Sequence, residues 1–300
     1  MHALVLGASG LIGRRLMARL GPESAVGTFH RHPFPGGLPF DGSDGNGIEN
    51  LLRQVTGDIT HAFVLHGTIE VEACARDPAG TAELNVTRVA HVLTQLMAAG
   101  VTPVYVSSDY VFDGTRGGWR ESDPPDPQTQ YGKQKLAVER LLLEAPTPSL
   151  VVRCSRVIGA DIGVRNVLGP WVEEIRAGAT MRCATDQVFS PIAVDDVAGI
   201  LAELAGAHST GLYHLGGPNP LSRIDLLRLL LASIRAVDMA VHVDVVPCSL
   251  HDLPFLEKRP LDTSLNVDKL QAAIGWDFLP MKTLCETAAT RYFGPRRGSA

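Results

Sequence analysis

A chain of 300 residues, 45% hydrophobic and 20% charged, has the composition of an ordinary globular protein, which excludes a disordered or low-complexity chain. Its formal net charge of −5 provides no broad basic field, so we expect no nucleic acid partner. It has no apolar run of about 18 residues, no recognisable signal peptide and no cysteine pattern with ligand spacing, so we expect a cytoplasmic protein with no membrane contact, reduced thiols and no metal.

The first half of the chain alternates between apolar runs and segments with helical spacing. An apolar run at 2–6 ends in glycine, and the next segment carries leucine and isoleucine at helical intervals as far as Gly21. Further strands are predicted at 24–29, 60–65, 102–107 and 149–155, and further helices at 46–56, 80–99 and 129–144. Strands that alternate with helices imply right-handed crossovers. The sequence therefore predicts an α/β fold with a Rossmann-type, doubly wound parallel sheet.

This rhythm loosens after about residue 154. The sequence predicts helices at 165–177, 195–206 and 222–235, strand regions at 180–194, 211–217 and 241–246, and a helical C-terminus. We expect residues 1–153 to form a nucleotide-binding domain to which 185–215 return. The remainder, mainly 154–300, is expected to form a smaller C-terminal substrate-binding lobe.

The motif GASGLIG lies between the first strand and the first helix. Gly7 permits a sharp turn, Gly10 lets the backbone approach a pyrophosphate, and Gly13 allows the helix to pack against the strand. A tight turn without a ligand is the alternative, but the position after a strand favours dinucleotide binding. The predicted contacts of this turn are Gly7, Ser9, Gly10, Leu11, Ile12 and Gly13.

The end of the second strand distinguishes the two nicotinamide cofactors. An acidic residue there binds the free ribose hydroxyl of NAD, whereas arginine accommodates the extra phosphate of NADP. The sequence GTFHRHP contains Arg31 and no carboxylate, and Arg14 offers a second cation. Two solvated surface arginines are the alternative. We therefore predict NADPH rather than NAD, with Asp41, His66 and Gly67 as further cofactor contacts.

The motif YGKQK places Tyr131 and Lys135 on one face of a helix, because they are four residues apart. A phenol titrates near pH 10, and a nearby ammonium group favours the phenolate, so we expect Lys135 to lower the pKa of Tyr131. The alternative is an ordinary tyrosine and lysine on a surface helix. This pair is predicted to perform proton chemistry and to contact the cofactor.

The segment YVSSDYVFDG ends a strand at the carboxyl edge of the sheet, where doubly wound folds bind ligands. Ser108 is predicted to donate a hydrogen bond to a substrate carbonyl oxygen as negative charge develops on it. Ser107 as the active hydroxyl, or both serines as strand-end caps, are the alternatives. Asp109 and Tyr110 are predicted substrate contacts. His66, near the same edge, is either an acid–base group or a hydrogen-bonded loop residue.

These motifs, together with DQVFSP at 186–191 and RPLDTSLNVDKL at 259–270, resemble the extended short-chain dehydrogenases, most closely the dTDP-4-dehydrorhamnose reductase family. The resemblance implies reduction by NADPH of a 4-keto sugar carried on a nucleoside diphosphate, or of a related ketone. It places Ser108, Tyr131 and Lys135 on the family's catalytic positions. It also implies that Asn85 has a structural role or belongs to a proton relay.

Two segments depart from the family's pattern. VLHGTI at 64–69 stands where the family reads close to NAAAYT, and Arg156 stands where an aromatic residue is common. A guanidinium carries a permanent charge and a planar fork suited to carboxylate or phosphate. Our hypothesis is that Arg156 binds an anionic or otherwise different substrate.

The sequence therefore predicts an NADPH-dependent oxidoreductase whose partner is a small-molecule substrate, and the resemblance implies that this substrate is a nucleotide sugar. An epimerase or dehydratase that retains NAD is one alternative, although Arg31 favours an exchangeable phosphorylated cofactor. A non-catalytic regulatory subunit of the same fold is the other, against which the retained Ser108, Tyr131 and Lys135 argue. A homodimer is compatible with the sequence.

Overall fold

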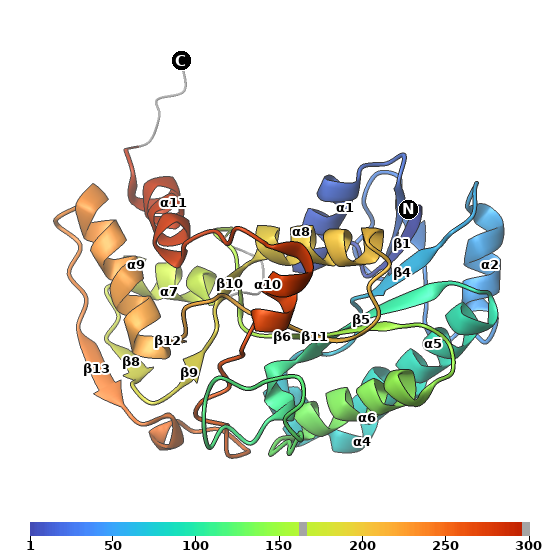
Figure 1. Cartoon of the computed structure of the whole chain (residues 1–300). Coiled ribbons are helices and arrows are strands. Elements are labelled where there is room, and N and C mark those ends of the chain that lie inside the picture. Colours follow the sequence, from blue (N-terminus) through green and yellow to red (C-terminus); the bar gives the residue numbers. More distant parts are fainter. Residues whose placement is uncertain (162–166, 296–300) are drawn as a thin grey trace.

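The computed structural model describes residues 1–161 and 167–295, which contain one parallel sheet of seven strands (Figure 1). From one edge to the other the strands are β11 (Gly211–Leu215), β6 (Leu150–Cys154), β5 (Thr102–Ser108), β4 (His61–Val64), β1 (Ala3–Leu6), β2 (Ala25–Phe29) and β3 (Leu38–Pro39). All pairings within it are parallel. The chain runs outwards from β1 through β2 and β3, then crosses to β4 on the other side of β1. The predicted Rossmann-type α/β fold is confirmed.

Helices cover both faces of this sheet (Figure 1). On one face, α1 (Leu11–Leu20) packs against α8 (Val194–Gly206). The other face is covered by α2 (Gly47–Gln54), α5 (Arg88–Ala98) and α6 (Gln130–Glu144). Because both faces are buried, the central strands are apolar at nearly every position instead of alternating.

The C-terminal half of the chain builds a hydrophobic core of its own away from this sheet (Figure 1). It contains α7 (Leu168–Arg176), α9 (Arg223–Val237), α11 (Met281–Phe293) and the parallel strand pair β8 (Met181–Ala184) and β13 (Val245–Cys248). Two short pairs accompany it, β7 (Val157–Ile158) with β10 (Ile192–Ala193) and β9 (Val188–Phe189) with β12 (Leu221–Ser222). Within 185–215, α8 and β11 pack with the main sheet, whereas β9 and β10 pair with other short strands.

Some predicted elements differ from the structure. The helix predicted at 80–99 consists of α4 (Pro78–Ala82), the π-helical turn η1 (Glu83–Thr87) and α5. The strand predicted at 241–246 begins too early, because β13 starts at Val245, which pairs with Met181 of β8. The prediction lacked α3 (Val71–Arg76) and β3, which are too short to show periodicity. The remaining short elements are η2 (Asp109–Val111), η3 (Leu250–Asp252) and α10 (Asp268–Ile274).

The other predicted helices and strands match observed elements to within a few residues. Residues 165 and 166 of the helix predicted at 165–177 lie outside the described residues, and the rest of it corresponds to α7. Within the described ranges, no helix combines the length and apolar character that crossing a membrane requires.

Candidate active site

The segment that joins β1 to α1 requires glycine at two positions. A Cβ atom on Gly13 would lie 2.4 Å from the carbonyl oxygen of Gly7, and Gly7 itself has a φ of +90°, which favours glycine. The helix begins at Leu11 with Gly10 as its N-cap, so its first N–H groups have no partner within the helix. The turn therefore has the geometry expected of a phosphate-binding loop. Ser9 directly precedes the N-cap Gly10, and Ile12 is the second residue of α1.

A cavity of about 220 Å³ opens beside this turn, at the carboxyl ends of β1, β2 and β4. It brings together three residues predicted as cofactor contacts, Asp41, His66 and Gly67, with Gly7. The rest of its lining is Thr28, Phe29, His30, Phe40, Gly42, Thr68, Leu84 and Arg88. This is the crevice at which the strand order reverses, where doubly wound folds bind nucleotides.

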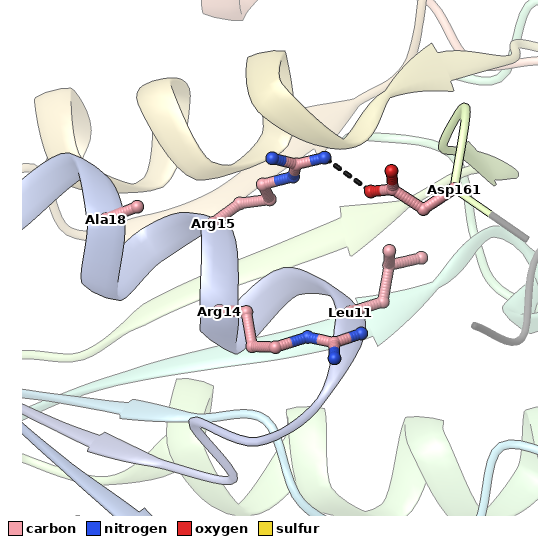
Figure 2. Close-up of a pocket in the computed structure, with 5 residues that line it drawn as sticks. All are labelled: Leu11, Arg14, Arg15, Ala18 and Asp161. Atoms are coloured by element: carbon pink, nitrogen blue, oxygen red, sulfur yellow. Dashed lines mark hydrogen bonds and ion pairs between the residues drawn. The ribbon is translucent and has the colours of Figure 1, made fainter. Parts of the chain in front are cut away.

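The two arginines predicted to bind the extra phosphate of NADP do not line this cavity. Arg31 is exposed, just beyond His30 at the cavity's edge. Arg14 lines a separate pocket of about 270 Å³ with Leu11, Arg15, Ala18 and Asp161, as Figure 2 shows. Arg15 donates a 2.6 Å hydrogen bond to Asp161 there. The expectation that Arg14 supplies a second cation beside Arg31 therefore receives no support from the cavity lining.

Arg88 is a cation of this cavity that the sequence did not reveal. It is the first residue of α5, directly after the π-helical turn. The pKa of Asp41 is lowered mainly by the hydrogen bonds that Asp41 accepts from Ser43, and the charge of Arg88 makes a smaller contribution in the same direction. No local pattern marks it, because Arg88 and Asp41 meet only through the tertiary fold.

His66 is a neutral residue of the cavity wall. Burial, with a smaller contribution from the charge of Lys135, lowers the pKa of His66 to about 4. Among the described residues, neither ring nitrogen of His66 has a hydrogen-bond partner, and the ring packs edge-on against Phe40 at a centroid distance of 6.2 Å. A histidine that stays neutral near pH 7 is a poor proton donor, so the geometry favours contact with a ligand over acid–base chemistry.

Asn85 fixes the loop that follows His66. Its amide oxygen accepts a 2.7 Å hydrogen bond from the N–H of Thr68, and its amide nitrogen donates to the carbonyl of Thr68 and to Gln134 of α6. Asn85 is buried within the π-helical turn η1, a distortion often found at functional sites. These contacts support the structural role implied for Asn85, because they connect the loop at 66–68 to the helix that carries Tyr131.

Tyr131 and Lys135 lie on α6 beside the end of β5, where Ser108 is the last residue. The Ser108 hydroxyl is close enough to Tyr131 to lower the pKa of its phenol in part. The Lys135 ammonium donates a 3.0 Å hydrogen bond to the carbonyl of Val106 and lies 5.8 Å from the centroid of the Tyr131 ring. The structure therefore brings together the three residues predicted to be catalytic. Ser107, the alternative, is buried with no partner for its hydroxyl among the described residues.

The start of α6 packs directly on the segment after Ser108. A Cβ atom on Gly132 would lie 2.1 Å from the carbonyl oxygen of Tyr110, so only glycine allows this approach. Thr129 caps the helix by accepting a 3.1 Å hydrogen bond from the N–H of Gly132. The ring of Tyr110 meets that of Tyr131 edge-on at a centroid distance of 6.1 Å. Tyr110, a predicted substrate contact, is therefore a direct neighbour of Tyr131.

The pKa of Tyr131 is raised, so the prediction that it is lowered is wrong. Burial raises the pKa of Tyr131 above its usual value, and the opposing effect of the Ser108 hydroxyl is smaller. Burial also lowers the pKa of Lys135 to about 8. The phenol is therefore neutral near pH 7 and carries the proton that an acid must donate, while most of Lys135 remains charged.

We predict that activity falls as the pH rises through about 8, because the pKa of Lys135 is lowered to about 8 and its ammonium loses its charge above that pH. That charge stabilises the phenolate left after Tyr131 donates its proton. The measurement is the pH profile of kcat for ketone reduction. In Lys135→Arg, which keeps its charge, the decline should move to higher pH. An unchanged decline in that variant would assign the inflection to another group.

Asp109 joins three segments through its carboxylate. One oxygen accepts a 3.1 Å hydrogen bond from Ser108, and the other accepts hydrogen bonds from Ser155 (3.1 Å) and Thr263 (2.9 Å). Burial raises the pKa of Asp109, and the nearby charge of Arg156 opposes that effect. Asp109 was predicted as a substrate contact, but these bonds show that it orients Ser108 relative to the end of β6 and the segment containing Thr263.

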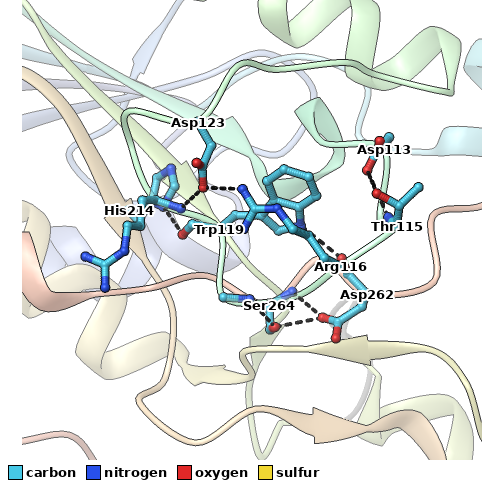
Figure 3. A network of polar contacts seen from close by, with 10 residues as sticks. Asp113, Thr115, Arg116, Trp119, Asp123, His214, Asp262 and Ser264 are labelled. Atoms are coloured by element: carbon cyan, nitrogen blue, oxygen red, sulfur yellow. Dashed lines mark hydrogen bonds and ion pairs between the residues drawn. The ribbon is translucent and has the colours of Figure 1, made fainter.

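A second polar network holds the loop after this motif, shown in Figure 3. The indole N–H of Trp119 donates to the carbonyl of Asp262 (3.1 Å), and the hydroxyl of Ser264 accepts from Gly118 (2.9 Å). A ring nitrogen of His214 lies 3.0 Å from the carbonyl oxygen of Trp119. The RPLDTSLNVDKL segment therefore anchors the loop that follows the SSDYVFDG motif.

Comparison with known proteins agrees with this geometry. Residues 1–292 match the family model described as RmlD substrate binding domain. A probable low-salt glycan biosynthesis reductase of Haloferax volcanii is 26% identical over 284 residues, covering 92% of this chain and 93% of its own. The dTDP-4-dehydrorhamnose reductase of Salmonella typhimurium is 26% identical over 282 residues, covering 90% and 91%.

Two further comparisons extend this result. The methionine adenosyltransferase 2 subunit beta of Bos taurus is 31% identical over 162 residues, which are 53% of this chain and 47% of its own. The crystal structure of a dTDP-4-dehydrorhamnose reductase from Bacillus anthracis in complex with NADP superposes with a TM-score of 0.81 at 22% identity, covering 97% of this chain and 98% of that one. The predicted resemblance is confirmed, and the match over residues 1–292 shows that this chain belongs to the RmlD substrate binding domain family.

Proposed function

We propose that this chain is an NADPH-dependent ketoreductase that reduces the 4-keto group of a nucleoside-diphosphate deoxysugar or a related ketone. The observation that carries the proposal is the buried, neutral phenol of Tyr131, with Ser108 at the end of the adjoining strand and Lys135 alongside. This group lies at the same sheet edge as the glycine turn and its cavity. The reductases among the relatives support this reaction class.

In the proposed reaction the ketone carbon receives a hydride and Tyr131 donates its phenolic proton to the carbonyl oxygen, so that an alcohol forms. A bound nicotinamide cofactor supplies the hydride. The Ser108 hydroxyl, which donates to Asp109 in the structure, donates instead to the carbonyl oxygen of the bound substrate as charge develops on it. The charge of Lys135 stabilises the resulting phenolate until a proton from solvent restores the phenol.

The described residues fit such a cofactor. The turn at Gly7, Gly10 and Gly13 leaves backbone N–H groups at the start of α1 for a pyrophosphate, and the space there excludes a Cβ atom on Gly13. Asp41, His66 and Gly67 line the adjoining cavity, as Arg88 does, and Arg31 stands just beyond it. We assign the extra phosphate of NADP to the cations at this end, chiefly Arg31. The NADP complex of the Bacillus anthracis neighbour supports the choice of NADP over NAD.

Two other functions predict different behaviour. An epimerase or dehydratase on this fold would purify with NAD bound and would not consume added NADPH. A regulatory subunit would form a stable complex with another protein and oxidise no NADPH, and the bovine relative is named as a subunit of another enzyme. The Ser108, Tyr131 and Lys135 arrangement argues against the regulatory subunit, and Arg31 argues against an enzyme that retains NAD.

The proposed function is tested by cofactor consumption in the full-length chain. We expect the purified protein to oxidise NADPH when a nucleoside-diphosphate 4-keto sugar is added, and to use NADH less efficiently. Arg31→Ala should lose about 10- to 100-fold in kcat/KM for NADPH and little for NADH, because a charge-assisted hydrogen bond contributes about 1.5–3 kcal/mol. Arg19→Ala, an exposed arginine at the end of α1, is the matched control. Stoichiometric bound NAD with no NADPH consumption would contradict the proposal.

A further inference from the structure

Arg156 follows strand β6, which pairs with the strand β5 that ends in Ser108. Cys154 at the end of β6 is the register partner of Ser108, so Arg156 follows that partner by two residues. Its carbonyl accepts a 3.0 Å hydrogen bond from the N–H of Ile192, and the hydroxyl of neighbouring Ser155 donates to Asp109. The backbone of Arg156 is therefore fixed at the edge of the sheet where the carbonyl would be reduced.

A second arginine approaches from the C-terminal core. Arg223 is the first residue of α9, and its N–H donates a 2.8 Å hydrogen bond to the carbonyl of Gln187. The Arg156 guanidinium lies 5.7 Å from the ring centroid of Phe189, and Phe189 pairs with Leu221, two residues before Arg223. The Arg223 guanidinium in turn lies 5.2 Å from the ring centroid of Trp171. Strand β9 thus contacts Arg156 through Phe189 and pairs with β12, the strand that directly precedes Arg223.

Neither guanidinium forms a close ion pair with another described residue, and the carboxylates of Asp109 and Glu174 act on them only from a longer distance. In the part of the chain that the structure describes, no Asp or Glu oxygen lies within 4.0 Å of Arg156 or Arg223. Burial, followed by the charge of Arg156, lowers the pKa of Arg223, so the two cations act on each other. The nearby carboxylate of Asp109 is occupied by three hydroxyl groups. Two half-buried cations that repel each other are stabilised when an anion lies between them.

We infer that Arg156 and Arg223 bind a carboxylate carried by the sugar part of the substrate, next to the carbonyl that is reduced. This inference rests on the proposed reductase function and names its substrate class. A planar guanidinium fork matches a carboxylate in two parallel hydrogen bonds, which a neutral deoxysugar does not offer. The phosphates of the nucleotide are the competing source of negative charge. The carboxylate is favoured because Arg156 stands beside Asp109 and Ser108, at the reacting end of the site.

Binding measurements on the full chain with NADP⁺ test this without requiring turnover. The probes are the glucuronate and glucose conjugates of UDP and dTDP, and the bare nucleotides. For at least one nucleotide, we expect the glucuronate conjugate to bind about 10- to 100-fold more tightly than the glucose conjugate. Arg156→Gln and Arg223→Gln should each remove most of that preference and leave affinity for the glucose conjugate nearly unchanged. Arg182→Gln, an exposed arginine on β8, should retain the preference.

Three results would overturn the inference. The first is equal or no binding of the glucuronate and glucose conjugates in both nucleotide series. The second is a preference that survives in both arginine variants. The third is an equal loss of affinity for the bare nucleotides, which would assign the arginines to the phosphates. Thermal unfolding of each variant checks that it is folded. Failure here combined with NADPH oxidation of neutral keto sugars would leave the reductase function intact, whereas absence of NADPH oxidation with every keto sugar would contradict that function itself.

Discussion

Tyr131→Phe is expected to lose about 10²- to 10⁴-fold in kcat/KM for ketone reduction, the usual contribution of a positioned acid. The substitution removes the hydroxyl that carries the proton and leaves the ring, which is buried against Tyr110 and Cys74. Steady-state kinetics with saturating NADPH measure the loss.

The matched control for this variant is Tyr213→Phe, on the edge strand β11, which should retain normal kinetics. Binding of NADPH to Tyr131→Phe, measured by fluorescence titration, separates loss of proton transfer from loss of cofactor. Full activity in Tyr131→Phe with unchanged cofactor affinity would assign the acid to another group.

The second large effect concerns stability and involves Glu139, which lies four residues after Lys135 on the same face of α6. Glu139→Gln is expected to lower the free energy of unfolding by about 3–5 kcal/mol, because it leaves the charge of Arg153 buried without its partner. Arg153 donates three hydrogen bonds of 2.8 to 3.1 Å to Glu139, and the side chains are only 3% and 1% exposed. This pair fastens α6, with Tyr131 and Lys135, to strand β6.

Denaturant unfolding followed by circular dichroism measures this change, with the midpoint and slope fitted separately. Glu144→Gln, at the exposed end of the same helix, is the control and should change stability by less than about 0.5 kcal/mol. A Glu139→Gln variant as stable as the control would mean that the Arg153 charge finds water or another partner.

The features predicted from sequence are those that local spacing determines. Gly7, Gly10 and Gly13 are a pattern within one turn, and Tyr131 and Lys135 are four residues apart on one helix, so both could be interpreted before the fold was known. The alternation of strands and helices predicted the sheet for the same reason. The choice between Ser107 and Ser108 needed the structure, because strand register decides which hydroxyl faces Tyr131.

The remaining features depend on contacts between distant segments. Arg88 and Arg223 join the site through the tertiary fold, and no motif surrounds either of them. The π-helical turn around Asn85 has the composition of an ordinary helix, so periodicity extended the prediction through it. The pKa of Tyr131 was predicted in the wrong direction because its proximity to Lys135 is visible in the sequence, whereas its burial is not.

Isotope transfer from NADPH tests the central claim most directly. The full-length chain is given a nucleoside-diphosphate 4-keto sugar and NADPH deuterated at both positions of the reactive nicotinamide carbon, and the product is analysed by mass spectrometry and NMR. Reduction in which Tyr131 supplies the proton predicts one deuterium on the new carbinol carbon for each NADPH oxidised, and a correspondingly slow reaction in Tyr131→Phe. Product without deuterium, or conversion without consumption of NADPH, would contradict the reductase assignment and favour a retained cofactor.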